Sequence, residues 1–193
     1  MAMIERFLGH RLRGIRTGEV GLLSRQPDFF EVPLSIILKS QSFESGGEIP
    51  LKFSSEGENI IPDLEWSCLP AGTEELVLVV EDIDVPLPKP FVHSIIYGIP
   101  PAVGEIKEGW HPQANSSDRI SGAMLYGKNT SGSDSYRGPR PILGHGKHRY
   151  VFQIFALDKK FQWPKPPAKK DLAAKLRGHV LAHGELVGTY ERK

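Results

Sequence analysis

Apolar residues in the middle of the chain occur in short runs that have the period of β-strands. The clearest runs are "ELVLVVED" (75–82), "VHSIIYGIP" (92–100) and "RYVFQIFAL" (149–157). Clusters of Gly, Pro, Ser and Asn separate them, as expected of an antiparallel β domain. Each run is apolar on both of its alternating faces, which is typical of central strands covered on two sides. We therefore predict a mainly β fold in which two antiparallel sheets pack as a sandwich.

Helical spacing is found near the C-terminus, in "KKDLAAKLRGHVLAHG" (169–184). Leu172, Leu176 and Val180 recur on one face, Asp171 stands near the start, and Gly184 is the predicted stop. The segment "ELVGTY" (185–190) would then return to the sheet as a last strand. The fold should therefore carry a few short peripheral helices, one of them near the C-terminus.

The first twenty residues also place apolar side chains near helical spacing, with arginines on the remaining faces. Amphipathic, arginine-rich segments of this kind are typical of mitochondrial presequences, but Glu5 and Glu19 argue against that reading. We favour an N-terminal helix that is docked or loosely held. The predicted organisation is an N-terminal extension, 1–34, followed by one β domain, 35–193.

Composition excludes several classes of protein. The 193 residues include 24 Lys and Arg against 23 Asp and Glu, so no global field favours a nucleic acid. The single cysteine, Cys68, cannot form an intramolecular disulfide, and no secretory signal is recognisable, which favours a reducing, cytoplasmic location. No apolar run has the length of a transmembrane helix.

The segment 110–148 is dense in Gly, Ser, Asn and Pro and shows little periodicity. A connection of this length inside a compact domain is usually either functional or disordered.

Polar side chains stand where the predicted strands begin and end. Asp82 closes the first strand, His93 opens the second, and His148 opens the third. If the first two strands form a hairpin, Asp82 and His93 lie at one rim of the sheet, within plausible hydrogen-bonding range. The connecting "IDVPLPKPF" (83–91) contains three prolines and should form a rigid wall. The pattern alone does not show whether His148 faces the same rim.

Several kinds of chemistry fit these residues. Ser94 and Cys68 are the possible nucleophiles, but neither lies in a G-x-S-x-G turn. Two histidines and an aspartate match a facial-triad metal set, although no second histidine stands two or four positions from His93 or His148. Imidazole N–H groups also bind phosphate-type anions. On spacing alone, an anion site and a purely structural role at strand ends are equally supported.

Five motifs occur in order along the chain: "GGEIPLKFSSEGENIIPDLEW" (46–66), "DIDVP" (82–86), "FVHSII" (91–96), "GKN" with "YRGPRP" (127–141) and "HRYVFQIFAL" (148–157). With these motifs the chain resembles the phosphatidylethanolamine-binding proteins, and within them the bacterial-type branch. This family includes Raf kinase inhibitor protein, the plant flowering-time regulators and a yeast carboxypeptidase Y inhibitor. Together the motifs are far more specific than any one of them.

The resemblance implies a two-sheet antiparallel β fold with a small pocket at the sheet end. In the family this pocket binds phosphate, acetate or phosphorylethanolamine. The pocket residues carried over by position are Asp82, Asp84, Phe91, His93, Pro139, Pro141, His148 and Tyr150. Four positions depart from the family pattern and would alter the pocket walls: Ile83, Val85, Phe91 and Ile142.

The function expected from residues and resemblance together is that of a non-enzymatic binding protein without a metal or cofactor. His93 and His148 would hold a small anion, and Asp82 would orient an imidazole or receive the ligand's ammonium group. Its cellular partner would be a kinase or a protease. Two alternatives remain: inhibition of a protease or kinase through surface loops such as 110–147, and hydrolysis of phosphoesters.

Overall fold

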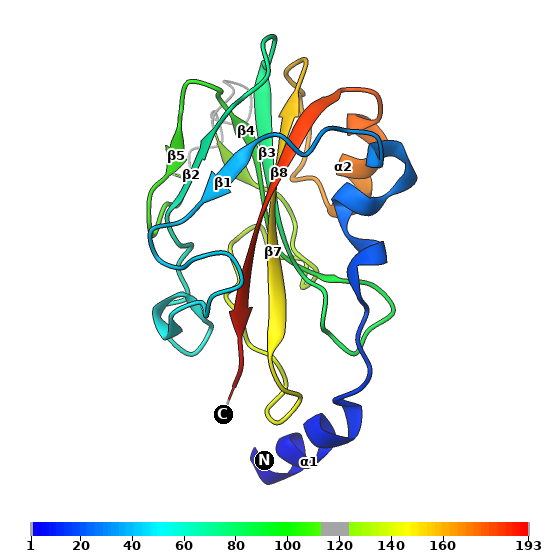
Figure 1. Cartoon of the computed structure of the whole chain (residues 1–193), viewed down its shortest axis with the longest axis vertical. Coiled ribbons are helices and arrows are strands. Elements are labelled where there is room, and N and C mark those ends of the chain that lie inside the picture. The colour runs from blue at the N-terminus through cyan, green and yellow to red at the C-terminus, as the bar shows by residue number, and fades with distance from the viewer. Residues whose placement is uncertain (1, 113–123, 193) are drawn as a thin grey trace.

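The computed structural model describes residues 2–112 and 124–192, in which eight strands and two α-helices form (Figure 1). The elements are α1 (Ala2–Leu12), β1 (Ile37–Lys39), β2 (Leu64–Ser67), β3 (Glu75–Asp82), β4 (Phe91–Ile99), β5 (Glu105–Ile106), β6 (Leu125–Tyr126), β7 (His148–Leu157), α2 (Lys169–Leu176) and β8 (Val180–Tyr190). Residues 113–123 of the predicted loop 110–148 lie outside this part. Within it, no helix is long and apolar enough to cross a membrane.

The strands form two antiparallel sheets, as the apolar pattern predicts. One has the order β1-β2-β5 and the other the order β6-β4-β3-β7-β8. β3 lies in the middle of the larger sheet and pairs with β4 on one side and β7 on the other. Since all its neighbours are antiparallel to it, the end of β3 meets the starts of β4 and β7.

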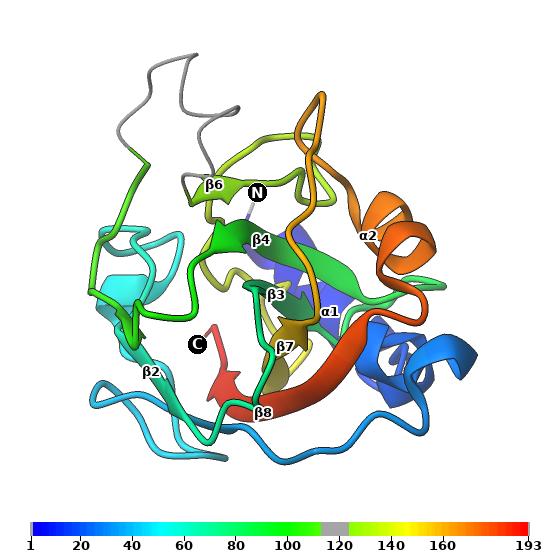
Figure 2. The same ribbon diagram turned by 90° about the horizontal axis from the view of Figure 1, so that it is seen from above.

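Both faces of the five-stranded sheet are buried, which explains the two-sided apolar strands. On β3, Leu76, Leu78 and Val80 join the core shared with the smaller sheet. The alternating Val77 and Val79 point to the opposite face, because successive side chains alternate across a strand. Figure 2 shows that α2 and the N-terminal part of the chain cover this second face. A sandwich of two sheets is therefore completed by a third, helical layer.

The segment between α1 and β1 is part of the folded body. It forms single 3₁₀ turns at Glu19–Gly21, Leu23–Arg25 and Pro27–Phe29. Leu23 and Phe29 are buried against the outer face of the large sheet. The backbone N–H of Leu23 donates to Glu81 Oε2 at 2.9 Å, and that of Ser24 donates to Gln153 Oε1 at 3.0 Å. The segment thus supplies both apolar cover and partners for polar side chains of the sheet.

The prediction that the C-terminal helix runs to Gly184 is wrong. α2 ends at Leu176, and Gly178 adopts the left-handed conformation (φ 73°) that commonly follows a helix. The following residues pair with β7 as β8, so hydrogen bonding in the sheet outweighs their helical spacing. Gly184 lies inside β8, where a Cβ would stand 2.4 Å from the carbonyl oxygen of Ile36.

Candidate functional site

Three predicted site residues meet at one edge of the large sheet. Asp82, the last residue of β3, pairs with Phe91 on β4 and with Tyr150 on β7. His93 and His148 each lie two positions from one of these partners. The antiparallel arrangement therefore brings Asp82, His93 and His148 to the same rim, although 55 residues separate the two histidines in the chain.

A pocket of about 200 Å³ opens at this rim. Its lining residues are Asp82, Val85, Pro86, Leu87, Phe91, His93, Arg137, Arg140, Pro141, Ile142 and His148. Five of the eight residues carried over from the family are among them, and three are not: Asp84, Pro139 and Tyr150. The pocket has the size of a small anion or headgroup rather than of an extended substrate.

Asp84 faces away from the pocket and forms a buried ion-pair cluster. Arg149 donates to it through Nε at 2.8 Å and through Nη2 at 2.9 Å, and Arg16 Nη1 lies 3.0 Å from Oδ1. Burial opposes ionisation of Asp84, but hydrogen bonds from the two arginines outweigh it and hold the pKa at about 2. Asp84 is therefore positioned as an anchor for Arg149 and for the N-terminal segment.

Tyr150 and Pro139 support the pocket from behind. The buried Tyr150 ring meets the His93 ring edge-on, with centroids 5.1 Å apart, and burial raises the pKa of its hydroxyl well above the usual value. Pro139 is buried, and its carbonyl accepts a hydrogen bond from the backbone N–H of Ser55 at 3.0 Å. Both residues position their neighbours without lining the pocket.

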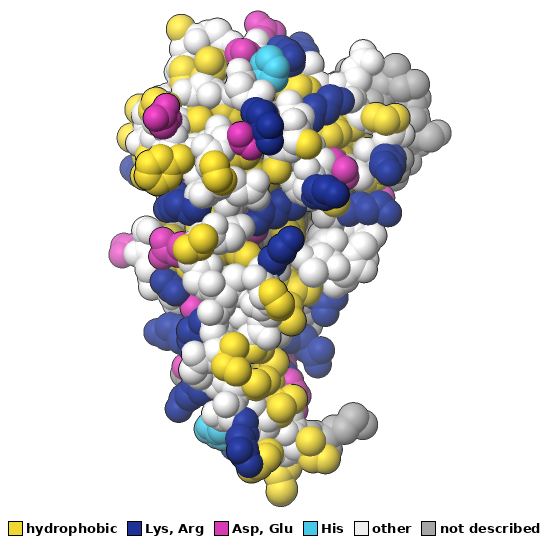
Figure 3. All heavy atoms as spheres, turned by 90° about the vertical axis from the view of Figure 1, so that its right-hand side faces the viewer, with side chains coloured by type: hydrophobic (Ala, Val, Ile, Leu, Met, Phe, Trp, Pro, Cys, Tyr) yellow, Lys and Arg dark blue, Asp and Glu magenta, His cyan; other side chains and the backbone are white. Residues whose placement is uncertain are grey.

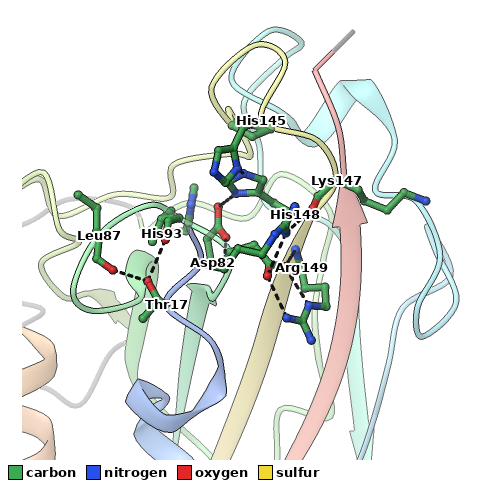
Figure 4. Close-up of polar contacts among 12 residues, drawn as sticks. Thr17, Asp82, Leu87, His93, His145, Lys147, His148 and Arg149 are labelled. Carbon is green, nitrogen blue, oxygen red and sulfur yellow. Dashed lines mark hydrogen bonds and ion pairs between the residues drawn. The ribbon is translucent and has the colours of Figure 1, made fainter. Parts of the chain in front are cut away.

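The carboxylate of Asp82 begins a row of hydrogen-bonded groups that leads out of the pocket (Figure 4). Oδ2 lies 2.7 Å from His148 Nδ1, and Oδ1 accepts from the backbone N–H of Asp84 at 2.8 Å. His148 Nε2 lies 2.7 Å from His145 Nδ1, and His145 Nε2 lies 2.8 Å from the carbonyl oxygen of Leu12. Asp82 thus pairs with His148, whereas the hairpin geometry suggested His93.

The number of protons in this row follows from its geometry. A carbonyl oxygen only accepts, so His145 Nε2 donates to Leu12. Three hydrogen bonds join the four groups and need three protons, whereas two neutral imidazoles supply only two. Burial lowers the pKa of His145, and the nearby His148 lowers it further.

His93 is bound differently and keeps one nitrogen for a ligand. Its Nδ1 donates to the carbonyl oxygen of Arg137 at 2.6 Å, and the ring lies 4.9 Å from the Phe91 ring. No hydrogen bond from Nε2 to another described residue is present. Burial lowers the pKa of His93 below its ordinary value, although the charge of Asp82 opposes the shift. His93 is therefore a neutral imidazole at neutral pH.

Three residues that complete this site were not predicted from the sequence. Arg137 and Arg140 are exposed and line the pocket mouth, and His145 joins His148 to α1. The two arginines lie in "YRGPRP", the motif that supplied the predicted proline wall, so two cations beside those prolines were an available signal. For His145, the spacing His145-x-x-His148 was visible, but no local pattern indicates its bond to Leu12.

The proline-rich loop after β3 is held by the N-terminal segment. Thr17 donates from its backbone N–H to the carbonyl of Val85 at 3.1 Å, and its Oγ1 donates to the carbonyl of Leu87 at 2.7 Å (Figure 4). The N–H of Gly18 donates to the carbonyl of Ile83 at 2.8 Å. One wall of the pocket is therefore fixed both by its prolines and by residues far away in the sequence.

Comparison with known proteins identifies the family. The family model for phosphatidylethanolamine-binding protein matches residues 39–191. A UPF0098 protein of Aquifex aeolicus is 36% identical over 154 residues, which cover 79% of this chain and 86% of that protein. A UPF0098 protein of Pyrococcus horikoshii is 39% identical over 154 residues, covering 80% of this chain and 76% of its own length.

Solved structures agree with this assignment. A phosphatidylethanolamine-binding protein homologue of Chlamydia trachomatis has 35% identity and a TM-score of 0.73, and the match covers 83% of this chain and 99% of that one. YbcL of E. coli, at 24% identity, shares the fold with a TM-score of 0.71 over 82% of this chain and 99% of its own. The resemblance seen in the sequence is confirmed: the chain belongs to the phosphatidylethanolamine-binding protein family, in its bacterial-type branch.

Proposed function

We propose that the protein is a non-enzymatic binding protein that holds a small phosphate-type anion in the pocket at the end of β3. The observation that carries the proposal is the convergence of His93 with Arg137 and Arg140 around a pocket of about 200 Å³. Two guanidinium groups at the mouth and an imidazole inside form a cationic, hydrogen-bonding environment that suits phosphate, phosphorylethanolamine or acetate.

The geometry supports a different role for each polar residue of the pocket. Both ring nitrogens of His148 are engaged, by Asp82 and by His145, so His93 Nε2 is the imidazole nitrogen that contacts the anion. Both oxygens of Asp82 are also engaged, which supports its role in orienting an imidazole over the capture of an ammonium group. Val85, Pro86 and Phe91 form apolar walls that exclude water around the bound group.

We further propose that this binding activity regulates a kinase or a protease in the cell. The competing hydrolase hypothesis has less support, because Ser94 and Cys68 do not line the pocket. In addition, within the described ranges no three His, Cys, Asp or Glu side chains are grouped to hold a metal ion. Turnover of a generic phosphoester that is lost on chelation would revive that hypothesis.

The proposal predicts a pH-dependent affinity for phosphorylethanolamine. The imidazolium form of His93 is the better anion donor, and burial places its pKa below the ordinary value of 6.5. Affinity measured by isothermal titration calorimetry should therefore rise as pH falls through the weakly acidic range. His93→Ala and Arg140→Gln should each weaken binding by about tenfold, the loss expected for one charge-assisted hydrogen bond.

His179→Ala is the matched control, because His179 is also hydrogen-bonded through its Nδ1, to Asp158, but does not line the pocket. Its affinity should equal that of the unaltered protein. An affinity that is the same at acidic and alkaline pH, or unchanged by His93→Ala, would contradict the proposed site.

A further inference from the structure

The N-terminal helix α1 turns its apolar side chains toward solvent. Met3, Ile4, Phe7 and Leu8 are 86%, 75%, 63% and 49% exposed. At 100° per residue these four positions form one continuous stripe along the helix. Figure 3 shows hydrophobic side chains gathered at the narrow end of the molecule, which is the end occupied by α1 in Figure 1. A surface helix normally buries such a stripe against the core.

The opposite side of α1 is attached to the body by backbone and polar contacts. Gly9 packs so closely that a Cβ there would stand 2.1 Å from the carbonyl oxygen of Leu143. Glu5 forms an ion pair with Arg192, and the carbonyl of Leu12 accepts from His145. The helix is therefore fixed in its orientation, and the fold does not use the apolar stripe.

The charges on α1 are almost all positive. Arg6 flanks the stripe on one side, Arg13 follows directly after the helix, and the guanidinium of Arg11 lies 5.4 Å from the centre of the Phe7 ring. Among the described residues, none of these three arginines forms an ion pair with a carboxylate. Glu5, the single acidic residue of the helix, is already neutralised by Arg192. A partner for this surface has to be apolar and anionic at once.

We propose that α1 is a docking surface for an anionic phospholipid bilayer. A helix with an apolar stripe and arginines at its borders lies in the interfacial plane, with the stripe among the acyl chains and the guanidinium groups at the lipid phosphates. A second copy of this chain fits less well, because it would bring another set of arginines against the first.

The test is co-sedimentation of the full chain with vesicles. The protein should bind vesicles of phosphatidylcholine mixed with phosphatidylglycerol, and should bind phosphatidylcholine alone at least tenfold more weakly, since each arginine near an anionic surface contributes about fivefold. The variant Ile4→Ser/Phe7→Ser should lose about tenfold or more in partitioning. The variant Arg6→Gln/Arg13→Gln should lose a similar factor and part of its dependence on salt, since Arg11 remains.

Val20→Ser/Phe30→Ser is the matched control, because these two apolar side chains are 87% and 78% exposed but lie outside α1. It should bind vesicles as the unaltered protein does. Equal partitioning of the unaltered protein and Ile4→Ser/Phe7→Ser would overturn the proposal. A second outcome would also overturn it. In that case light scattering would show that the unaltered protein is a dimer and that Ile4→Ser/Phe7→Ser is a monomer, and neither of the two would bind vesicles.

Discussion

Asp82 and Asp84 are two residues apart, yet the fold gives them different partners and different roles. Asp82 closes β3 inside the pocket and accepts from His148, whereas Asp84 lies beyond the strand end and accepts from Arg149 and Arg16. A carboxylate held by two guanidinium groups stays ionised down to low pH. At the residue scale, Asp84 therefore connects three separate parts of the chain.

Replacing Asp84 with asparagine should lower the free energy of unfolding at neutral pH. A pKa held at about 2 instead of 3.8 corresponds to roughly 2 kcal/mol, and solvent screening at the partly exposed Arg149 reduces this to about 1 to 2 kcal/mol. Because the folded pKa is depressed, this stability is complete above pH 3.8 and is lost as pH falls toward 2. Urea unfolding of Asp84→Asn and of the unaltered protein, at neutral pH and near pH 2, measures this difference in the free energy of unfolding.

The control for this experiment is Asp158→Asn, because Asp158 is 40% exposed and pairs with a single histidine. Its effect should stay within about 0.5 kcal/mol at both pH values. If the deficit of Asp84→Asn were as large in acid as at neutral pH, the ion pairs would not be its cause.

At the element scale, α1 is connected to the pocket through side chains rather than through an apolar interface. The row from Asp82 through His148 and His145 ends on the carbonyl of Leu12, the last residue of α1. Movement of α1 and the position of the His148 ring are therefore coupled. Through this coupling, a movement of α1 changes the geometry of the anion pocket.

The variant His145→Ala should loosen α1 while leaving the sheet folded. It removes the hydrogen bond to Leu12 and the partner of His148 Nε2, so the helix should open more often. Trypsin cleavage at the arginines of α1 should be faster by about fivefold, the loss expected for one hydrogen bond between uncharged groups. His179→Ala, which removes a half-buried histidine far from α1 in the sequence, should be cleaved at the original rate. Equal rates for both variants would show that α1 is held independently of His145.

At the scale of the whole molecule, the folded body begins earlier in the chain than the residues that the family model matches. The match begins at residue 39, but Leu23 and Phe29 already pack on the outer face of the large sheet. The Phe29 ring lies 6.1 Å from that of Phe155 on β7. The separation of the chain into residues 1–34 and 35–193 remains a prediction, yet part of the first stretch contributes to the core.

Phe29 and its neighbour Phe30 offer a direct comparison, since they are 1% and 78% exposed. Phe29→Ala should lower the free energy of unfolding by about 3 to 5 kcal/mol, because it leaves a cavity against the sheet. Phe30→Ala should change it by less than about 0.5 kcal/mol. Chemical unfolding followed by tryptophan fluorescence measures both. Similar losses in the two variants would mean that the segment is not packed as described.

The sequence alone determined the sheet architecture and much of the site. Strands apolar on both faces require cover on both sides, and a hairpin of consecutive strands places Asp82 and His93 at one rim. These inferences rest on alternation and on contacts between near neighbours, which are local properties. Local spacing gave the wrong element at residues 180–184, where a segment with helical spacing pairs with β7 as part of β8.

Tertiary structure alone decided which distant residues complete the site. The position of β7 beside β3 brought His148 to Asp82, and the docking of α1 placed Leu12 against His145. It also turned the apolar stripe of α1 outward, although periodicity would equally suit a buried face. Long-range pairing depends on the free energy of the whole chain, which the pattern of one segment does not report.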